Sequence, residues 1–201
     1  MINFFLILFF YVSITITQTI PPYEYSDWEV LQDKDIWVGW SNYKEFNWGK
    51  AKITFDYSMG QISSILEDHK NYTKIFKRIT KSEVNEDGVV YVVLDMPFPI
   101  SHRDYVVFYK QFKKKNHRVY QFFSTIHNDF PVDPYNVRLP RATGEWRLIP
   151  VDDNTTELIY IWNGELLGDF PDFALTRAWT EQGDEVMNWL KESLKKIDKG
   201  K

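Results

Sequence analysis

The sequence predicts an α+β fold in which one curved antiparallel sheet wraps around a long C-terminal helix. Three observations predict it. Apolar residues alternate along a series of short segments, two short stretches between them have helical spacing, and helical spacing returns over a long segment near the C-terminus. The chain has 201 residues, of which 44% are hydrophobic and 17% aromatic. This length and composition favour one domain with a sizeable core or an apolar cavity, and exclude a disordered chain.

Strand signals come first along the chain. Near-alternating apolar positions predict strand structure in Trp28–Trp40, and clear alternation predicts a strand in Trp48–Tyr57. The pattern then becomes helical, with Ser58 as a suitable N-cap for a helix through Ile62–His69 and a second short helix in Tyr72–Ile79. We therefore expect strand pairs followed by two short helices.

Six strand-like runs follow, and turn signals between them indicate consecutive antiparallel strands. They are Ser82–Asn85, Val89–Asp95, Tyr105–Phe112, Arg118–Ile126, Glu145–Ile149 and Thr156–Trp162. From Asp169 to Lys199 apolar residues recur at helical spacing, which predicts the long C-terminal helix. Gly183 is the expected place for a bend in it.

The first residues form a separate segment. No charged side chain occurs before Glu24, and Ile2–Val12 is apolar except for Asn3, which is the length of a signal-peptide core. We therefore expect residues 1–19 to be a signal peptide or an uncleaved N-terminal anchor, and the folded domain to occupy residues 24–199. The expected location is outside the cytoplasm, secreted or periplasmic, with a membrane tether if the segment stays attached.

Charge and residue counts exclude several functional classes. Lys and Arg number 24 against 28 Asp and Glu, and the net charge of -4 lacks the basic character of a nucleic-acid binder. Without cysteine, a disulfide framework, a thiolate metal site and a cysteine nucleophile are excluded. The four histidines lack metal-ligand spacing, and no nucleotide, dinucleotide, nucleophile-elbow or zinc-protease motif occurs. We expect no metal, no cofactor and no catalytic residue.

The remaining charged groups have structural interpretations. Arg103 and Asp104 stand together at a strand start, where such neighbours form local ion pairs, and Asp129 and Asp133 are explained by loop solvation. Two lysine-rich clusters are either solvated ends of elements or docking points for an anionic membrane surface. They comprise Lys110, Lys113, Lys114, Lys115 and Arg118 near a hairpin tip, and Lys191, Lys195, Lys196, Lys199 and Lys201 at the chain end.

Four segments in order carry a family resemblance. Residues 96–106, with the sequence MPFPISHRDYV, are followed by Val137-Arg138, by Gly144-x-Trp146 and by residues 168–173, GDFPDF. Together they resemble START (steroidogenic-acute-regulatory-related lipid transfer) domains, most closely the phosphatidylcholine-transferring members. The resemblance implies the helix-grip fold (START/Bet v 1-like), with an apolar cavity for one lipid and the C-terminal helix as its lid.

The resemblance leaves the ligand open. Aligning on Tyr72 places Glu67 and Thr73 where phosphatidylcholine-transferring members hold the phosphate, and Tyr109 stands where sterol-binding members have an arginine. Neither signature carries over. Which face of each strand points inward stays open, and the helix residues fit an ordinary core equally well. The candidate ligand-binding residues are Tyr91, Asp95, Arg103, Tyr105, Tyr109, Tyr160, Trp162, Phe173 and Trp179.

The leading hypothesis is a monomer that binds, and in its fuller form transfers, a lipid or other hydrophobic small molecule during transient contact with a membrane surface. The alternative is an enzyme of the helix-grip superfamily, cyclase-like or hydrolase-like, with Asp95, Arg103 and Tyr109 as polar groups in the pocket. A third hypothesis is an interaction module whose own side chains fill the pocket, leaving less than the roughly 300 Å³ typical of ligand sites.

Overall fold

The computed structural model describes residues 19–199. The expected signal peptide or anchor, residues 1–19, therefore lies outside the described residues except for its last position. Within the described range, no helix has both the length and the apolar character that crossing a bilayer requires.

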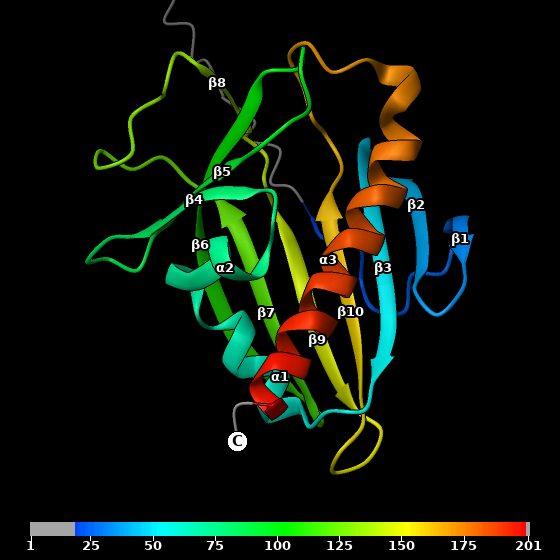
Figure 1. Ribbon diagram of the computed structural model, residues 1–201. Helices are drawn as coiled ribbons and strands as arrows, with labels where there is room; N and C mark the ends of the chain where they lie inside the picture. Colours follow the sequence, from blue (N-terminus) through cyan, green and yellow to red (C-terminus); the bar gives the residue numbers. More distant parts are fainter. Residues whose placement is uncertain (1–18, 200–201) are drawn as a thin grey trace, which may run out of the picture.

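Ten strands form one sheet, in which neighbours are antiparallel except for β8, which runs parallel to β6 (Figure 1). The strands are β1 (Glu29–Asp33), β2 (Trp37–Tyr43), β3 (Phe46–Phe55), β4 (Ile79–Val84), β5 (Val90–Leu94), β6 (His102–Lys114), β7 (His117–Ser124), β8 (Asn136–Arg138), β9 (Gly144–Pro150) and β10 (Thr156–Asn163). Their spatial order is β1-β2-β3-β10-β9-β7-β6-β5-β4. The first strands of the chain therefore lie beside the last one.

Short helices cover one end of the sheet, and a long helix follows the last strand. They are α1 (Met59–Leu66), the 3-10 turn η1 (His69–Asn71), α2 (Tyr72–Ile75), the 3-10 turn η2 (Asp172–Ala174) and α3 (Leu175–Lys199). The predicted cap of α1 is confirmed: the Ser58 hydroxyl accepts from the Gln61 N–H (3.3 Å), and the Gln61 side chain accepts from the Ser58 N–H (3.1 Å). This reciprocal capping box satisfies donors that the first turn leaves free.

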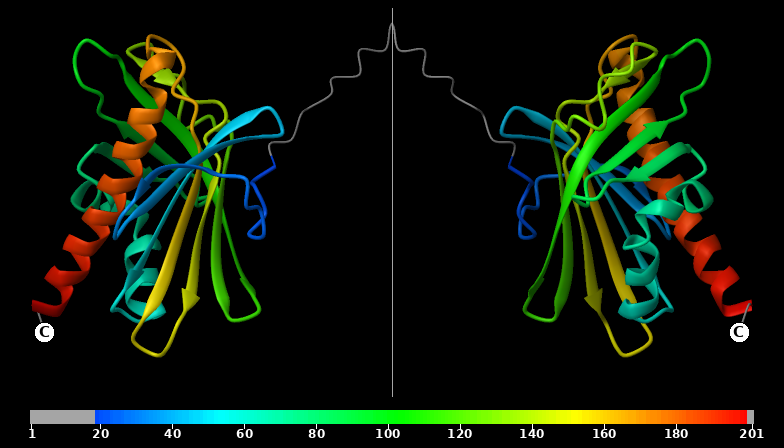
Figure 2. Two further views of the ribbon diagram at one scale, coloured as in Figure 1. Left: turned by 90° about the vertical axis from the view of Figure 1, so that its right-hand side faces the viewer. Right: turned by 90° about the vertical axis from the view of Figure 1, so that its left-hand side faces the viewer.

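The 25-residue α3 lies across the concave face of the sheet (Figure 2). Gly183 lets it approach closely, because a Cβ built there would be 2.9 Å from the Val38 side chain of β2 and 3.2 Å from Ala51 of β3. The structure thus gives Gly183 a packing role. Leu190 and Leu194, further along α3, belong to the main core between helix and sheet.

A second apolar cluster lies on the outer face of the sheet. Trp48, Ile159 and Ile161 alternate with core residues along β3 and β10, so they point away from α3. Ile20 and Trp28 of the N-terminal segment pack against them. Residues just before the expected domain start at 24 therefore contact the sheet.

The structure differs from the sequence prediction at three places. The six predicted strands do pair consecutively, as β4, β5, β6, β7, β9 and β10, but a further strand that was not predicted, β8, pairs in parallel with β6. β8 has three residues, too few for an alternating pattern to be recognised. Ile79 begins β4 instead of ending the second helix, and α3 begins at Leu175, after the turn η2.

Candidate functional site

A cavity of about 370 Å³ lies between α3 and the concave face of the sheet. Its wall is mainly apolar, and ten of the thirty lining residues are aromatic, among them Phe76, Phe122, Trp146, Tyr160, Trp162 and Trp189. The volume exceeds the roughly 300 Å³ at which ligand sites begin. The third hypothesis requires that the protein's own side chains fill the space between helix and sheet. The wall side chains leave this space open.

Stacked aromatic rings form the part of the wall over β9 and β10. The Tyr160 ring stacks on Trp146 at 3.9 Å and on Trp162 at 4.7 Å between centroids. Gly49 of β3 makes room for this arrangement, because a Cβ there would be 2.3 Å from the Trp162 ring. The stack fixes these side chains in one orientation, so this part of the wall is preorganised.

The cavity also contains tyrosine hydroxyls. Burial raises the pKa of Tyr105, Tyr109 and Tyr160, so these hydroxyls stay protonated at neutral pH. Burial is also the main cause of the raised pKa of Tyr72, and a hydrogen bond with Tyr109 acts in the opposite direction. Tyr72 in turn donates to the Leu66 carbonyl at 2.6 Å. Hydrogen bonding therefore runs from the cavity wall to the end of α1.

Charged side chains line one end of the cavity, here called the mouth. Arg78 donates to both carboxylate oxygens of Glu185 on α3, at 2.5 and 2.9 Å. Glu185 is the main cause of the raised pKa of Arg78. Also on α3, Arg177 pairs with Glu181 at 2.8 Å.

Two further carboxylates at the mouth are paired from outside the cavity wall. Arg141 donates to Glu165 at 2.6 Å, and His102 lies 3.2 Å from Asp95. Three of the four carboxylates are thus paired with arginines, and the fourth, Asp95, lies beside a histidine that is a cation only when protonated.

Two loops, residues 95–101 and 164–171, border the mouth and are called the mouth loops. Arg103 is fully buried and joins them: it donates to the carbonyls of Ser101, Leu166 (2.9 Å) and Leu167 (2.6 Å) and pairs with Asp169 (2.9 Å). Ser101 N–H and hydroxyl bonds, followed by Arg103, lower the pKa of Asp169 to about 2. Arg103 thus forms an ion pair, as expected of a charged group at a strand start, but its partner is the distant Asp169 and not the neighbouring Asp104.

Asp104 has the same kind of role on the other face of β6. Its carboxylate accepts two hydrogen bonds from Arg138 (2.7 and 3.1 Å) and one from the Tyr91 hydroxyl (3.0 Å). Burial raises the pKa of Tyr91 to about 12. This buried network fixes β8 to β6 on the side away from the cavity.

We compared the sequence and the fold with those of known proteins. No family model matches the sequence. An uncharacterized protein of Pseudomonas aeruginosa is 26% identical over 178 residues, which are 83% of this chain and 78% of that protein. A solved STAR-related lipid transfer protein from Xanthomonas axonopodis is 19% identical, with a TM-score of 0.75 over 85% of this chain and 99% of that one.

The chain has the START fold. Human STARD10 agrees, with a TM-score of 0.76 at 12% identity over 86% of this chain and 74% of that one. The predicted fold class is therefore confirmed: a curved antiparallel sheet, a long C-terminal helix and two short helices form the helix grip.

Within this START fold, five of the nine candidate ligand-binding residues line the cavity. They are Asp95, Tyr105, Tyr109, Tyr160 and Trp162. Tyr105 and Tyr109 extend from the same face of β6, and Tyr160 and Trp162 from the same face of β10, as strand alternation requires. Asp95 lies just past the end of β5.

The other four do not form part of the cavity wall. Tyr91 lies on the outer face of β5, in a cluster with Phe130. Arg103 is covered by a mouth loop, and Phe173, 90% exposed, lies in η2 before α3 begins. Trp179 is buried beside the cavity, where its indole N–H donates to the Gly164 carbonyl at 2.7 Å.

Several wall residues of the START fold were not singled out from the sequence. Phe122 and Trp146 continue the inward faces of β7 and β9. Gln182 lies four residues before Val186 on α3 and Glu185 lies three residues after Gln182, so helical spacing could have found Gln182 from Val186 and then Glu185 from Gln182. Arg78 lies between α2 and β4, where no periodic pattern marks it.

Metal-ligating side chains do not gather anywhere in residues 19–199, where no group of three or more His, Asp or Glu could hold an ion. His69 illustrates the alternative use of a histidine. Its ring stacks on Tyr109 at 4.1 Å, and burial lowers its pKa to about 4. It is therefore an uncharged packing residue at neutral pH.

Proposed function

We propose that this protein binds a lipid or another hydrophobic small molecule in the cavity under α3 and transfers it between membranes. The observation that carries the proposal is the mainly apolar cavity of about 370 Å³ inside a START fold. Each methylene group moved from water into such a space contributes about 0.8 kcal/mol. The Xanthomonas neighbour is named as a lipid transfer protein, which supports the same use of the fold here.

Release needs an opening, and the contacts of α3 suggest where it forms. At the mouth, the helix is tied to the rim by the Arg78–Glu185 ion pair, whose side chains are partly exposed. Exposed ion pairs contribute only about 0–1 kcal/mol each. We propose that α3 and the mouth loops move apart during exchange, while the packing of Leu190 and Leu194 retains the rest of the helix.

Apolar side chains around the mouth support membrane contact at this end. Phe98 in one mouth loop is 98% exposed, Phe173 next to the other is 90% exposed, and Leu167 is also exposed. Large apolar side chains gathered on a surface indicate an interaction site. The lysines of the β6–β7 tip and of the last turn of α3 lie at the opposite end of the molecule (Figure 1). The proposed membrane contact therefore uses the apolar rim and not the lysine clusters.

Export is proposed on the sequence alone, from the uncharged apolar segment in residues 1–19. N-terminal sequencing of material from outside the cytoplasm tests it. A start within residues 19–24 supports cleavage, and an intact Met1 in a membrane fraction supports the anchor.

Native mass spectrometry of the protein purified from its own source tests the binding function. A retained mass that dissociates on activation, and that organic extraction recovers as a lipid, is the expected result. Vesicle assays then follow movement of that lipid from donor to acceptor membranes. An empty protein that no member of a lipid panel stabilises contradicts the proposal.

The enzyme alternative has less support from the geometry. It requires Asp95, Arg103 and Tyr109 to act together in the pocket, yet Arg103 is fixed by backbone carbonyls outside the cavity wall. Turnover of a hydrophobic substrate by the purified protein would favour it over binding.

A further inference from the structure

The charged groups around the cavity restrict the ligand that the proposed function would carry. Two arginines and four carboxylates line the cavity. Each has a partner of opposite charge: Arg78 with Glu185, Arg177 with Glu181, Glu165 with Arg141, and Asp95 with His102 when that ring is protonated. Among the described lining residues, an anionic headgroup would thus meet no unpaired cation and an excess of carboxylates. Repulsion between these carboxylates and a negatively charged headgroup opposes binding.

The interior of the cavity offers neutral hydrogen-bonding groups instead. Tyr105 lines the cavity, and its hydroxyl makes no hydrogen bond among the described residues, while burial raises its pKa. A buried donor without a partner costs free energy that a ligand oxygen would recover.

Tyr109 and Tyr160 add two further phenol groups to the lining of the cavity. Burial raises the pKa of both, so each phenol stays protonated at neutral pH and can donate one hydrogen bond and accept others. Together with Tyr105, these groups match an uncharged oxygen, and a ligand hydroxyl could both accept and donate.

The volume sets the size of the ligand. Cavities that hold drug-sized ligands have volumes of about 300–1,000 Å³. The cavity here, at about 370 Å³, is near the lower limit of that range. This favours a compact ligand, such as a single short chain or a ring system, over a phospholipid with two long acyl chains.

We propose that the cavity selects an uncharged, compact lipid that carries a hydroxyl or carbonyl oxygen, and that Tyr105 and Tyr160 recognise this oxygen. The proposal rests on the proposed binding function. It assigns selectivity to the hydrogen-bonding groups of β6 and β10 inside the cavity, and exclusion of anions to the paired charges at the mouth.

Four probes with the same ten-carbon chain test the proposal: decan-1-ol, decane, decanoate and decyl phosphate. Changes in tryptophan fluorescence report binding, because Trp146, Trp162 and Trp189 line the cavity. We expect decanol to bind about fivefold more tightly than decane, as one net hydrogen bond allows, and at least tenfold more tightly than either anion. Tight binding of decanoate or decyl phosphate, at or below the dissociation constant of decanol, overturns the proposal.

Hydroxyl deletions locate the recognition. Tyr105→Phe and Tyr160→Phe preserve ring packing and are each expected to reduce the fivefold preference for decanol over decane, with decane binding unchanged. Tyr43→Phe is the matched control, since Tyr43 lies in the outer cluster and should leave all four affinities as they are. If both cavity variants keep the full preference, the assignment of these hydroxyls is wrong.

The outcomes also separate this inference from the proposed function. If the native protein binds decanol and decane with equal affinity, the cavity binds apolar molecules but does not recognise the ligand oxygen. This result overturns the inference and leaves the proposed binding function intact. Failure of all four probes to bind, decane included, overturns the binding function and the inference with it. Stoichiometric uptake of a two-chain phosphatidylcholine from vesicles supports the function and overturns the inference.

Discussion

The two ends of the molecule use the same kinds of residue for different purposes. At the end where α1 and α2 meet the last turns of α3, here called the closed end, Ile62, Leu66 and Leu194 are almost fully buried. At the mouth, Phe98 and Phe173 are almost fully exposed. Apolar side chains of the closed end stabilise the fold, whereas those of the mouth contribute little to it. Their exposure is better explained by contact with another surface.

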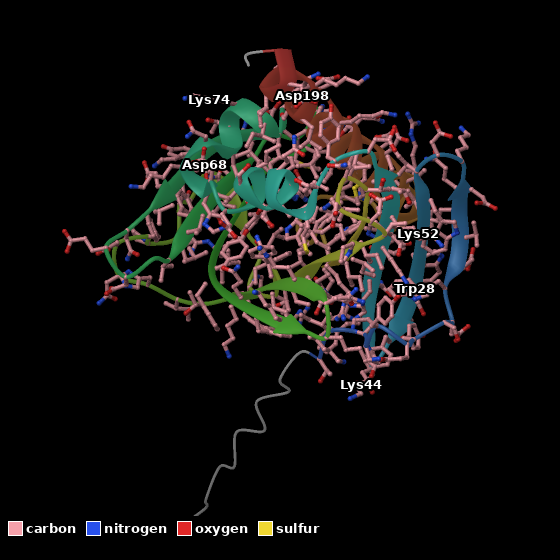
Figure 3. The ribbon with its side chains drawn as sticks, turned by 90° about the horizontal axis from the view of Figure 1, so that it is seen from below. Trp28, Lys44, Lys52, Asp68, Lys74 and Asp198 are labelled. Carbon is pink, nitrogen blue, oxygen red and sulfur yellow. The ribbon has the colours of Figure 1, made fainter. Side chains whose placement is uncertain are left out.

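Figure 3 shows the closed end, with Asp68 and Lys74 near the short helices and Asp198 at the end of α3. Polar contacts there join the same elements as the core does. Gln61 of α1 donates to Asp198 at 3.4 Å, and Lys77 pairs with Glu192 at 3.0 Å. The closed end therefore has both packing and surface contacts, while the mouth is held by paired charges and by Arg103.

The largest expected effect separates the two ends by stability. Leu194→Ala leaves a cavity in the core at the closed end and should lower the free energy of unfolding by about 2–5 kcal/mol. Phe173→Ala, at a 90% exposed position, should change it by no more than about 0.5 kcal/mol. Chemical denaturation measures both. Equal losses would show that the mouth residue also supports the fold.

A second prediction concerns pH at the closed end. The folded pKa of His69 is about 4, below its ordinary value of 6.5, so the unfolded chain takes up the proton first. The stability that this group permits is fully present above pH 6.5 and declines as pH falls towards 4, by up to about 3 kcal/mol.

Comparison with a variant isolates this contribution. His69→Phe keeps an aromatic ring against Tyr109 but cannot be protonated. Denaturation at several pH values should show native stability falling relative to His69→Phe across that window. If the free energy of unfolding changes with pH in the same way for both proteins, His69 has the same pKa in the folded and the unfolded chain.

The third prediction tests the mouth as a contact surface. The double variant Phe98→Ser/Phe173→Ser removes two exposed apolar side chains and should slow lipid transfer between zwitterionic vesicles about tenfold. Its melting temperature should match that of the native protein. Replacing Lys113 and Lys114 at the opposite end with serine serves as the control. Loss of transfer in the lysine variant alone would move the contact to that end.

The smallest expected effect concerns the charges that border the mouth. Glu185→Gln removes the negative charge that faces Arg78 and leaves an uncompensated cation on the cavity wall. Decyl phosphate should then bind about fivefold more tightly, which corresponds to about 1 kcal/mol, and stability should change by less than that. Fluorescence titration measures the affinity. An unchanged affinity for decyl phosphate would show that Arg78 does not contact the bound ligand.

The sequence predicted the architecture well because periodicity and family motifs pointed to the same elements. It could not decide the inward face of β5, where Val89–Leu94 is apolar at every position. Such a strand is covered on both faces, so alternation carries no signal. The structure places Val90 and Val92 inward and Tyr91 outward, against Phe130 from a distant loop.

Long-range contacts explain the other differences at the candidate site. Arg103 shares the inward face of β6 with Tyr105, but residues 164–171 fold over it, and no local sequence pattern predicts that contact. Phe173 was assigned to the predicted C-terminal helix, yet the chain forms the turn η2 there and α3 begins two residues later. Strand alternation did identify Tyr105, Tyr109, Tyr160 and Trp162, whose neighbours are set by the strand itself.

The outer cluster links maturation to stability. Ile20 packs against Trp48 on the outer face of the sheet, and the Tyr23 ring lies 4.9 Å from the Arg147 guanidinium. A peptidase that cut after Thr19 would keep these contacts, whereas one that trimmed the chain beyond Tyr23 would expose part of the sheet to water. If the proposed cleavage takes place, the position of the cut would therefore affect the stability of the remaining domain.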